Sequence, residues 1–388
     1  MRVKLKDIFD LQMGKTPSRS NLEYWNTTDY KWISIADLTK TSKYIFETKE
    51  YLSKSAIKDS GIKVIPANTV VMSFKLSIGK TAITKEDMYS NEAIMAFKDK
   101  HVINIIPEYI FYLFKYKNWE EGSNKAVMGK TLNKATLSEI EVEICSIEKQ
   151  RQIVNILDKI MSAVDGRKQE LQLLDELIKA RFVEMFGDPV KNPKGWEVVT
   201  IGDIVTEVRY GTSKPAGEGG NYPYLRMNNL TADGHLDLND LKYIDIPDDE
   251  IEKCVVRKGD VLFNRTNSIE LVGKTVVFDL QEDMIIAGYI IRVRLNKRLL
   301  PEILSQYMNL EALKDILRSM AKGAVNQANI NAQELQSIKV YIPDMELQKQ
   351  FIEMKNQVDK SKFDTMTFAP IYDIINLYLH THFYQGRR

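Results

Sequence analysis

Four Gly-Lys-Thr triplets are the residues of this chain that first suggest chemistry, because such a triplet closes the phosphate-binding loop of many nucleotide hydrolases. In the 388-residue sequence they occupy positions 14–16, 79–81, 129–131 and 273–275. A phosphate-binding loop also needs a glycine five residues before the glycine of the triplet. Those four positions hold Phe9, Phe74, Asn124 and Ser268. The triplets therefore do not predict nucleotide hydrolysis, and the one at 79–81, which reappears at 273–275, indicates a turn that carries a cation.

Two other groups imitate catalytic or metal-binding sites. Asp344, followed by Glu353 and Lys355, matches a nuclease signature, but a heptad pattern runs through these residues, so the charges are better explained by the surface of a helix. His380 and His382 lie close together near the end of the sequence, and two ligands alone do not predict a metal site. The sequence also lacks an Asn-Pro-Pro-aromatic motif and a glycine-rich adenosylmethionine loop, so methyl transfer is not indicated.

Polar and cationic residues in loops remain, and they occur at matching places in the two halves of the chain. In the first half they are Lys15, Thr16, Ser18, Arg19, Lys75, Ser77, Lys80, Lys125, Lys130 and Asn133. In the second half they are Arg209, Lys214, Arg226, Asn228, Asn229, Arg265, Asn267, Lys274, Lys322, Asn326 and Gln327. Arg, Asn and Gln pair with base edges and Lys with phosphates, so the set predicts DNA contacts. Each residue taken alone is equally explained as part of a solvated loop.

Two members of this set receive specific roles. Arg265 follows the apolar run 261–263, and the end of a strand holds a side chain rigidly enough to read a guanine. Lys274 follows Gly273 in a turn, which favours a contact with a phosphate. We therefore expect Arg265 to contribute specificity and Lys274 to contribute affinity for any sequence.

The composition sets few limits on this interpretation. The formal net charge is +1 and neither half of the chain is strongly basic, so a DNA-binding protein of this kind must gather its cations in a cleft. No apolar run reaches the roughly 18 residues that a membrane span needs, and the N-terminus does not resemble a signal peptide. Cys145 and Cys254 are far apart in the sequence. We expect a cytoplasmic protein with reduced thiols and no membrane partner.

The sequence contains an internal repeat with an offset of roughly 190–198 residues. Asp7-Ile8 reappears as Asp203-Ile204, and the segment 78–83 reappears as 272–277. Short apolar runs bounded by turn residues predict strands in both copies. These runs lie at 70–72 and 82–83 and at 261–263 and 276–278, while the segments 140–144 and 338–342 alternate apolar and polar residues, as half-buried strands do. Pro-Glu pairs open predicted helices at 107–118 and 301–319, so each copy is expected to be an α+β domain with a mixed β-sheet and short helices.

A long amphipathic helix is predicted after each copy. In the first helix, over 147–186, apolar residues alternate at spacings of four and three, as in the seam of a coiled coil. They are Ile153, Leu157, Ile160, Val164, Leu171, Leu174, Ile178 and Met185. Arg167 and Arg181 interrupt this seam, and Gly187 and Pro189 end the helix. The second helix begins with the same spacing, at Leu347, Phe351, Met354 and Val358. A helix with one apolar stripe needs a partner, and the other helix of the chain is the nearest.

The order of these features resembles the specificity subunit of type I restriction–modification systems over residues 1–362. The pieces that carry the resemblance are 14–17 after Asp7-Ile8, 148–153, 181–189 followed by 193–196, and 323–330. The resemblance implies two target-recognition domains joined by long antiparallel coiled-coil helices, with pseudo-twofold symmetry. It further implies a non-catalytic chain in which each domain reads one half of a bipartite, asymmetric DNA target while the helices set the spacing.

The resemblance also implies the partners of this chain. They are double-stranded DNA, two modification (methyltransferase) subunits and the restriction (helicase–nuclease) subunits, and the helices would dock the modification subunits. Adenosylmethionine and ATP with Mg²⁺ would be bound by those partner subunits, and no cofactor by this chain. The expected domains are 1–146, the central helix 147–188, 189–343, the second helix 344–362 and an atypical tail 363–388. The tail departs from the family because the repeat ends after Lys362 and Pro370 would break a helix.

Two other classes of protein stay open. A stand-alone nuclease or methyltransferase would need an acidic metal site or a cofactor loop in this chain. A scaffold protein with no DNA role would differ in a simple binding measurement, because phosphate contacts make DNA binding salt-dependent.

Overall fold

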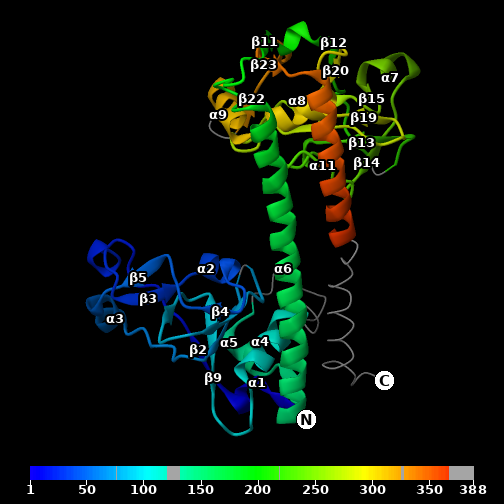
Figure 1. The fold of residues 1–388 in the computed structure, drawn as a ribbon. Coiled ribbons are helices and arrows are strands. Elements are labelled where there is room, and N and C mark those ends of the chain that lie inside the picture. The colour runs from blue at the N-terminus through cyan, green and yellow to red at the C-terminus, as the bar shows by residue number, and fades with distance from the viewer. Residues whose placement is uncertain (76, 120–131, 218, 325–326, 367–388) are drawn as a thin grey trace. The chain divides into compact units, whose positions relative to one another are not determined.

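The computed structural model describes residues 1–75, 77–119, 132–217, 219–324 and 327–366 (Figure 1). The chain divides into two compact units, which among these residues comprise 1–166 and 167–366. The division falls inside one long helix, and each unit contains one copy of the repeat, called copy one and copy two below.

Copy one is built on two sheets. A five-stranded sheet has the order β2-β9-β6-β7-β4 and a three-stranded sheet has the order β5-β3-β8. The strands are β2 (Phe9–Met13), β3 (Tyr30–Ile33), β4 (Tyr44–Ile45), β5 (Glu50–Leu52), β6 (Val70–Ser73), β7 (Thr81–Thr84), β8 (Tyr89–Ser90) and β9 (Ile94–Asp99). The helices are α1 (Leu5–Ile8), α2 (Ile35–Lys40), α3 (Lys54–Ser60), α4 (Pro107–Lys115) and α5 (Lys134–Ser138).

The central strand β6 explains how this sheet is covered on both faces. Side chains alternate along a strand, so Val70 and Met72 face one side and Val71 faces the other. Val70 and Met72 join the core cluster that contains α4, and Val71 joins a separate cluster with Ile33 and Ile45. The predicted strand at 70–72 is thus confirmed, and its continuous apolar run reflects burial on two sides.

Copy two has the corresponding sheets, with the orders β12-β20-β16-β18 and β14-β13-β19-β15, and a further three-stranded sheet β17-β22-β21. The strands are β12 (Val205–Tyr210), β13 (Tyr222–Leu225), β14 (Lys242–Ile244), β15 (Val255–Val256), β16 (Val261–Asn264), β17 (Thr266–Asn267), β18 (Thr275–Val277), β19 (Met284–Ile286), β20 (Ile290–Leu295), β21 (Lys322–Ala324) and β22 (Gln327–Asn329). The helices are α7 (Asp248–Cys254), α8 (Pro301–Met308), α9 (Glu311–Met320) and α10 (Ala332–Gln336). Short 3₁₀ turns include η3 (Met227–Asn229).

Each copy begins and ends on a pair of adjacent antiparallel strands. In copy one, β1 (Arg2–Lys4) pairs with β10 (Glu141–Glu143), and in copy two β11 (Glu197–Thr200) pairs with β23 (Lys339–Ile342). A buried glutamine at the start of the following helix completes this closure. Gln150 donates to the Asn104 carbonyl at 3.0 Å, and Gln348 donates to the Arg298 carbonyl at 3.1 Å. The expected repeat of one α+β domain is therefore confirmed in topology and in detail.

The two long helices are α6 (Ile147–Phe186) and α11 (Met345–Met366). Ile153 and Leu157 of α6 are buried in the core of copy one. In the second unit, the ring of Phe182 lies 5.2 Å from that of Phe351, and Asp175 pairs with Lys362. Because residue numbers fall along α6 as they rise along α11, the helices are antiparallel there, as expected.

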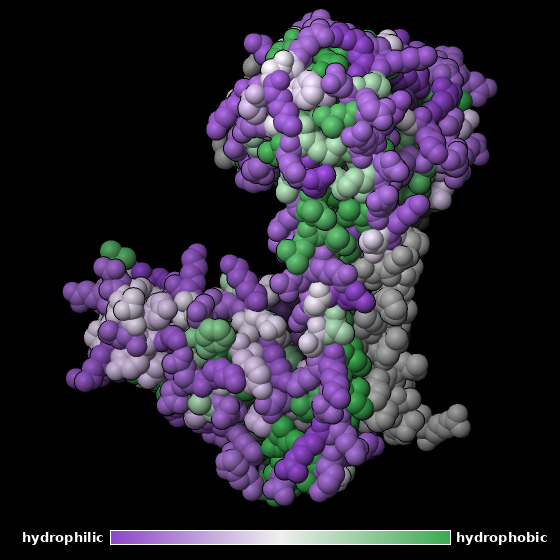
Figure 2. Space-filling model, in the orientation of Figure 1, coloured by the Kyte–Doolittle hydropathy of each residue, from purple (hydrophilic) through white to green (hydrophobic). Residues whose placement is uncertain are grey.

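The apolar seam of α6 is less complete than the sequence predicts. Ile178 is buried, but Leu171 and Leu174 are only half-buried, and the most buried aromatic contacts come from Phe182 and Phe186, which the heptad pattern missed. Leu173 and Leu177 are exposed, and Figure 2 shows patches of hydrophobic surface along α6.

One predicted helix is two. The segment 301–319 forms α8 and α9, because Asn309 ends α8 and turns its side chain to Thr275. The amide nitrogen of Asn309 donates to the Thr275 carbonyl at 2.6 Å, and its oxygen accepts from the Thr275 N–H at 3.3 Å. No helix in the described part of the chain is long and apolar enough to cross a membrane.

Candidate nucleic-acid interface

A glycine after the first long strand fixes where the first candidate loop departs in each copy. A Cβ atom at Gly14 or Gly211 would collide with backbone carbonyl oxygens at the ends of β8 and β19. The next backbone N–H then donates to the Ser90 carbonyl at 2.8 Å in copy one and to the Ile286 carbonyl at 2.9 Å in copy two. Only glycine allows this close approach, so the motif that suggested a phosphate loop has a structural role.

Arg19 and Lys15 of copy one are both engaged by the protein. The guanidinium carbon of Arg19 lies 3.7 Å from the ring centroid of Trp25, a cation–π contact, and its two terminal nitrogens pair with Glu50. The ammonium of Lys15 donates to the Ser60 carbonyl. Both side chains are exposed at the surface, so a phosphate would have to compete with these partners.

Thr16 and Ser18 lie in the same loop. The Thr16 hydroxyl donates to the Glu92 carboxylate, and this hydrogen bond is the main reason that the pKa of Glu92 is lowered. The Ser18 hydroxyl lies 2.8 Å from that of Ser20. The Glu92 carboxylate therefore holds the loop, and its negative charge would repel a phosphate bound beside Thr16.

The remaining residues predicted in copy one are less tied to carboxylates. Lys75 is half-buried with its ammonium 5.5 Å from the Phe74 ring, and Ser77 and Lys80 are exposed. Asn133 caps α5, since its side-chain oxygen accepts from the Thr136 N–H at 2.9 Å. The other two predicted residues, Lys125 and Lys130, lie outside the described residues.

Three predicted cations of copy two are ion-paired within the protein. The pairs are Arg209–Glu207 at 3.1 Å, Lys214–Glu250 at 2.9 Å and Arg226–Asp240 at 2.7 Å. Each carboxylate neutralises the charge that a phosphate would meet, so these residues offer less attraction than their sequence suggests.

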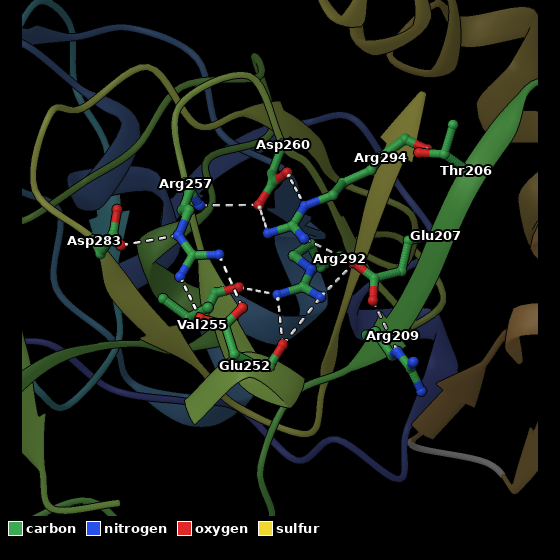
Figure 3. A network of polar contacts seen from close by, with 10 residues as sticks. All are labelled: Thr206, Glu207, Arg209, Glu252, Val255, Arg257, Asp260, Asp283, Arg292 and Arg294. Carbon is green, nitrogen blue, oxygen red and sulfur yellow. Dashed lines mark hydrogen bonds and ion pairs between the residues drawn. The ribbon is translucent and has the colours of Figure 1, made fainter. Parts of the chain in front are cut away.

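Arg209 belongs to a larger network that the sequence analysis missed (Figure 3). The Glu207 carboxylate accepts from Arg209 and, at 2.8 Å each, from Arg292 and Arg294. Burial opposes the ionisation of Glu207, but these arginines outweigh burial and lower the pKa of its carboxyl. Arg292 is fully buried, and it also donates to the Val255 carbonyl.

The network continues on the far side of Arg294. Arg294 pairs with Asp260 at 2.8 Å, and Arg257 binds both Glu252 and Asp283. Four arginines thus meet four carboxylates (Figure 3). The only sign of this network in the sequence is the alternation of Arg292 and Arg294 along a strand that is otherwise apolar.

Asn228 and Asn229 differ although they are neighbours. Asn228 is exposed, whereas Asn229 is buried. The side chain of Asn229 accepts from the Arg226 N–H and donates to the Asp237 carbonyl, both at 2.8 Å. The predicted DNA contact of Asn229 would require its amide to leave these partners, which hold the turn that carries Asn228.

Lys274 is also directed inward. Its side chain is 7% exposed, and its ammonium donates to the carbonyl oxygens of Met227 (2.7 Å) and Leu230. Burial lowers the pKa of Lys274. The predicted phosphate contact would require the ammonium to leave these two carbonyl groups, whose position beside the turn the sequence pattern did not reveal.

Arg265 differs from the other predicted arginines. Its backbone is held on both sides, since its N–H donates to the Tyr289 carbonyl and its carbonyl accepts from the Ile330 N–H, both at 2.9 Å. Its guanidinium lies 4.9 Å from the Tyr210 ring centroid, and its Nε has no hydrogen-bond partner. Among the described residues, no carboxylate lies within ion-pair distance of Arg265, so its charge is available to an added group.

The fold brings the segment 265–267 together with the strands β21 and β22, which begin at the predicted residues Lys322 and Gln327. Strand β17 pairs with β22, which places Asn267 opposite Ala328, and β22 pairs with β21. Asn267 itself donates to Asn264 at 2.8 Å. Lys322 and Gln327 begin β21 and β22, but their side chains, like Asn326 as a whole, lie outside what the structure describes.

One group of potential metal ligands exists in the described part of the chain. Ligand atoms of Asp175, Asp233 and His235 lie within 4.8 Å of one another. Lys362 already donates to Asp175, so a positive charge occupies this position. His380 and His382 lie outside the described residues.

Comparison with known proteins identifies the class to which this fold and these loops belong. The sequence model described as "Type I restriction modification DNA specificity domain" matches residues 1–176 and again 193–369. The chain therefore belongs to the type I restriction–modification DNA specificity family, as the resemblance in the sequence indicated.

Individual relatives carry the same description. The MjaIX specificity subunit of Methanocaldococcus jannaschii is 29% identical over 58% of this chain and 57% of its own length. The EcoKI specificity subunit of Escherichia coli K12 is 25% identical over 63% of this chain and 56% of its own. The aligned region thus spans little more than half the length of these relatives.

Solved structures show the same fold. A chain from a structure of the assembly and conformational transition of the type I R-M system has a TM-score of 0.59 at 18% identity, covering 98% of this chain and 97% of that one. The S subunit of a type I restriction–modification system from M. genitalium gives 0.53 at 13% identity, covering 99% and 96%.

Proposed function

We propose that this chain is a non-catalytic subunit that recognises a specific, bipartite DNA sequence, with copy one and copy two each reading one half-site. Membership of the specificity family supports this role, as does the presence of the same frame twice with different loops on it. Two similar domains with different side chains suit two different half-sites.

The observation that carries the proposal is the state of Arg265. Arg19, Arg209 and Arg226 each pair with a carboxylate, whereas Arg265 has none among the described residues. Its backbone is fixed at a strand end, which gives the precision that base reading requires. A guanidinium of this kind can bind O6 and N7 of a guanine in the major groove. Lys75 and Lys80 of copy one are then the cations that suit phosphates.

The long helices supply the second part of the proposal. We assign to α6 and α11 the task of setting the spacing of the half-sites and docking two modification subunits. The hydrophobic surface along α6, which includes Leu173 and Leu177, supports a docking role. Adenosylmethionine would be bound by the modification subunits, and ATP with Mg²⁺ by the restriction subunits that complete the complex.

A randomised DNA library tests the proposal, with methylation by the assembled complex of this chain and its modification subunits as the readout. Arg265→Ala should reduce discrimination at one base pair of one half-site by about 5- to 150-fold, equivalent to about 1–3 kcal/mol. The control is Arg298→Ala, which removes an exposed arginine of the same unit that pairs with Glu197 at 2.6 Å. Wild-type methylation without sequence preference would contradict the proposed function. Loss of preference in both half-sites would contradict the assignment of one half-site to each copy.

A further inference from the structure

Lys274 lies between two segments of copy two that the sequence predicts to contact DNA, one with Arg265 and one with Asn228. Its backbone carbonyl accepts from the Asn264 N–H at 2.8 Å, one residue before Arg265. Its ammonium reaches in the other direction, to the carbonyls of Met227 and Leu230, which flank the exposed Asn228. One residue therefore ties the strand end that carries Arg265 to the turn that carries Asn228.

The turn that receives this ammonium cannot supply its own donors. Met227–Asn229 is a three-residue 3₁₀ turn, and the backbone becomes extended at Leu230, with φ −96° and ψ 120°. The last carbonyls of a helix have no intrahelical N–H partner, and a buried carbonyl without a donor is costly. The ammonium of Lys274 supplies a donor to the carbonyl of Met227, the first residue of the turn, and to that of Leu230, the residue directly after the turn.

A second buried lysine fixes the residue before Lys274. Lys314 of α9 is 8% exposed, and its ammonium donates to the Gly273 carbonyl at 2.6 Å. Gly273 has a φ of +82°, and a Cβ atom there would collide with Leu317 of the same helix. Helix α9 thus fixes the backbone just before β18, and the side chain of Lys274 extends from this backbone to the turn at 227–229.

Copy one shows what the same backbone does without this link. Ser73 and Lys80 repeat the backbone bond of Asn264 and Lys274, with the Ser73 N–H donating to the Lys80 carbonyl at 2.9 Å. The side chain of Lys80, however, is exposed. The segment that corresponds to the 3₁₀ turn is α2, a six-residue helix with a capping box formed by Ser34 and Asp37. The carbonyl of Ile35, which corresponds to Met227, accepts from the Thr39 hydroxyl at 2.9 Å, and that of Asp37 accepts from the Thr41 N–H and hydroxyl. Threonines of the helix thus supply donors that copy two takes from a lysine.

We propose that Lys274, supported by Lys314, is a positioning residue that sets the placement of Asn228 relative to Arg265 and thereby the specificity of the half-site read by copy two. It does so without touching DNA. This inference rests on the proposed function, because it assumes that these two segments read bases.

The test uses the complex of this chain with its modification subunits and the variant Lys274→Met, which keeps much of the stem and removes the ammonium. Amide hydrogen exchange at 228–231 should become about tenfold faster, because these amides lose the support of the turn. Discrimination at base pairs of the copy-two half-site should fall by about tenfold in the library assay, and the dependence of binding on salt should not change.

Lys80→Met is the matched control in copy one. Its ammonium faces solvent, so the variant should weaken binding to all sequences, flatten the salt dependence by about one charge and leave the preferred sequence unchanged. Lys274→Arg, which retains a buried donor, should recover most of the discrimination. If Lys274→Met does not fold, Lys314→Met should give the same loss of discrimination and faster exchange at 273–275.

Two results would overturn the inference. One is a uniform loss of affinity with a flatter salt dependence in Lys274→Met, which would make Lys274 a phosphate contact. The other is unchanged exchange and unchanged specificity. Hydrogen exchange needs no DNA, so it tests the link even if the wild-type complex shows no sequence preference, an outcome that would instead remove the proposed function.

Discussion

In copy one and copy two, different side chains donate hydrogen bonds to the carbonyls of the same backbone segment, which precedes the central strand of the sheet. In copy one, Gln12 of the edge strand β2 lies opposite Ala96 of β9 and donates to the Lys63 and Val64 carbonyls at 3.0 and 3.1 Å. In copy two the position of Ala96 is occupied by Arg292, whose guanidinium supports the corresponding segment at Val255.

The two solutions have different consequences. A neutral amide needs only the carbonyls that it binds, whereas a buried guanidinium also needs a counter-charge. Copy two provides that charge with Glu207, and Glu207 then also binds Arg294 and Arg209. Electrostatic support inside copy two therefore determines which arginines near its surface are free, and copy one has no comparable constraint in its described residues.

Removing the counter-charge should produce the largest difference between the copies. Glu207→Gln leaves Arg292 buried without a carboxylate partner and should lower the free energy of unfolding of copy two by about 3 kcal/mol. The matched change in copy one is Asp10→Asn, which breaks an exposed pair with Lys98 (3.4 Å) and should cost less than about 1 kcal/mol. Urea unfolding of the whole chain, followed by hydrogen exchange in each copy, measures both. Equal losses of unfolding free energy in the two variants would show that the network stabilises the protein no more than an exposed ion pair does.

The buried glutamines should instead behave alike. Gln150 accepts from the Ile106 N–H and Gln348 from the Leu300 N–H, both at 2.9 Å, and each also donates to two carbonyls. Leucine at either position leaves these buried groups without a partner, so each variant should lose about 2 kcal/mol of unfolding free energy. Thermal or urea unfolding of the two variants decides this. A difference above about 1 kcal/mol would mean that the shared frame is not equally important in both copies.

An alkaline pH should stabilise copy two alone. Burial is the main cause that lowers the pKa of Lys314 to about 8, with Arg318, Lys274 and Lys179 adding repulsion and Glu311 opposing it. Above pH 8 the unfolded chain holds more protons at this lysine than the folded chain does. The free energy of unfolding should therefore rise with pH, by about 1.5 kcal/mol between pH 8 and 9.5.

The described part of copy one contains no buried lysine, so it should not share this rise. The range stops at pH 9.5 because buried tyrosines such as Tyr341, whose pKa is raised by burial, favour the unfolded chain once tyrosine ionises. Unfolding at several pH values, compared with Lys314→Met, gives the measurement. A rise of the same size in the variant would assign the effect to another group.

The smallest effect concerns a tether that only copy one has. Thr16 holds the first loop to Glu92, and the position that corresponds to Glu92 in copy two is Gly288. Thr16→Val should raise the pKa of Glu92 and speed amide exchange in the loop by a few-fold, with little change in overall stability. Titration of the Glu92 carboxyl by NMR follows the change, and an unaltered pKa would show that Thr16 is not its main partner.

Local patterns in the sequence predicted the elements well. The apolar runs at 70–72 and 261–263 are β6 and β16, and the heptad pattern from 147 to 186 is α6. These features depend on neighbours a few residues apart, which periodicity reports directly. The colinear repeat added the correspondence between the copies, because a duplicated sequence requires a duplicated frame.

Contacts between distant segments could not be predicted in the same way. The triplets at 79–81 and 273–275 are identical, yet Lys80 is exposed and Lys274 is buried. The side chain of Lys274 turns inward because it binds the carbonyl of Leu230, which is 44 residues away in the sequence. Arg209 looked free for the same reason, since nothing near it in the sequence indicates that Glu207 also serves a buried arginine. The candidate site could be located by its loops, but its free and committed charges required the fold.

The paired strands that open and close each copy have a consequence for inheritance. Arg2 lies opposite Glu143, and Glu197 lies opposite Ile342, so each domain leaves the chain and returns to it at adjacent points. A crossover between genes at these strands would exchange a complete folded domain while leaving the long helices in register. If the two copies read DNA as proposed, such an exchange would change the sequence that is recognised without changing the residues of α6 and α11.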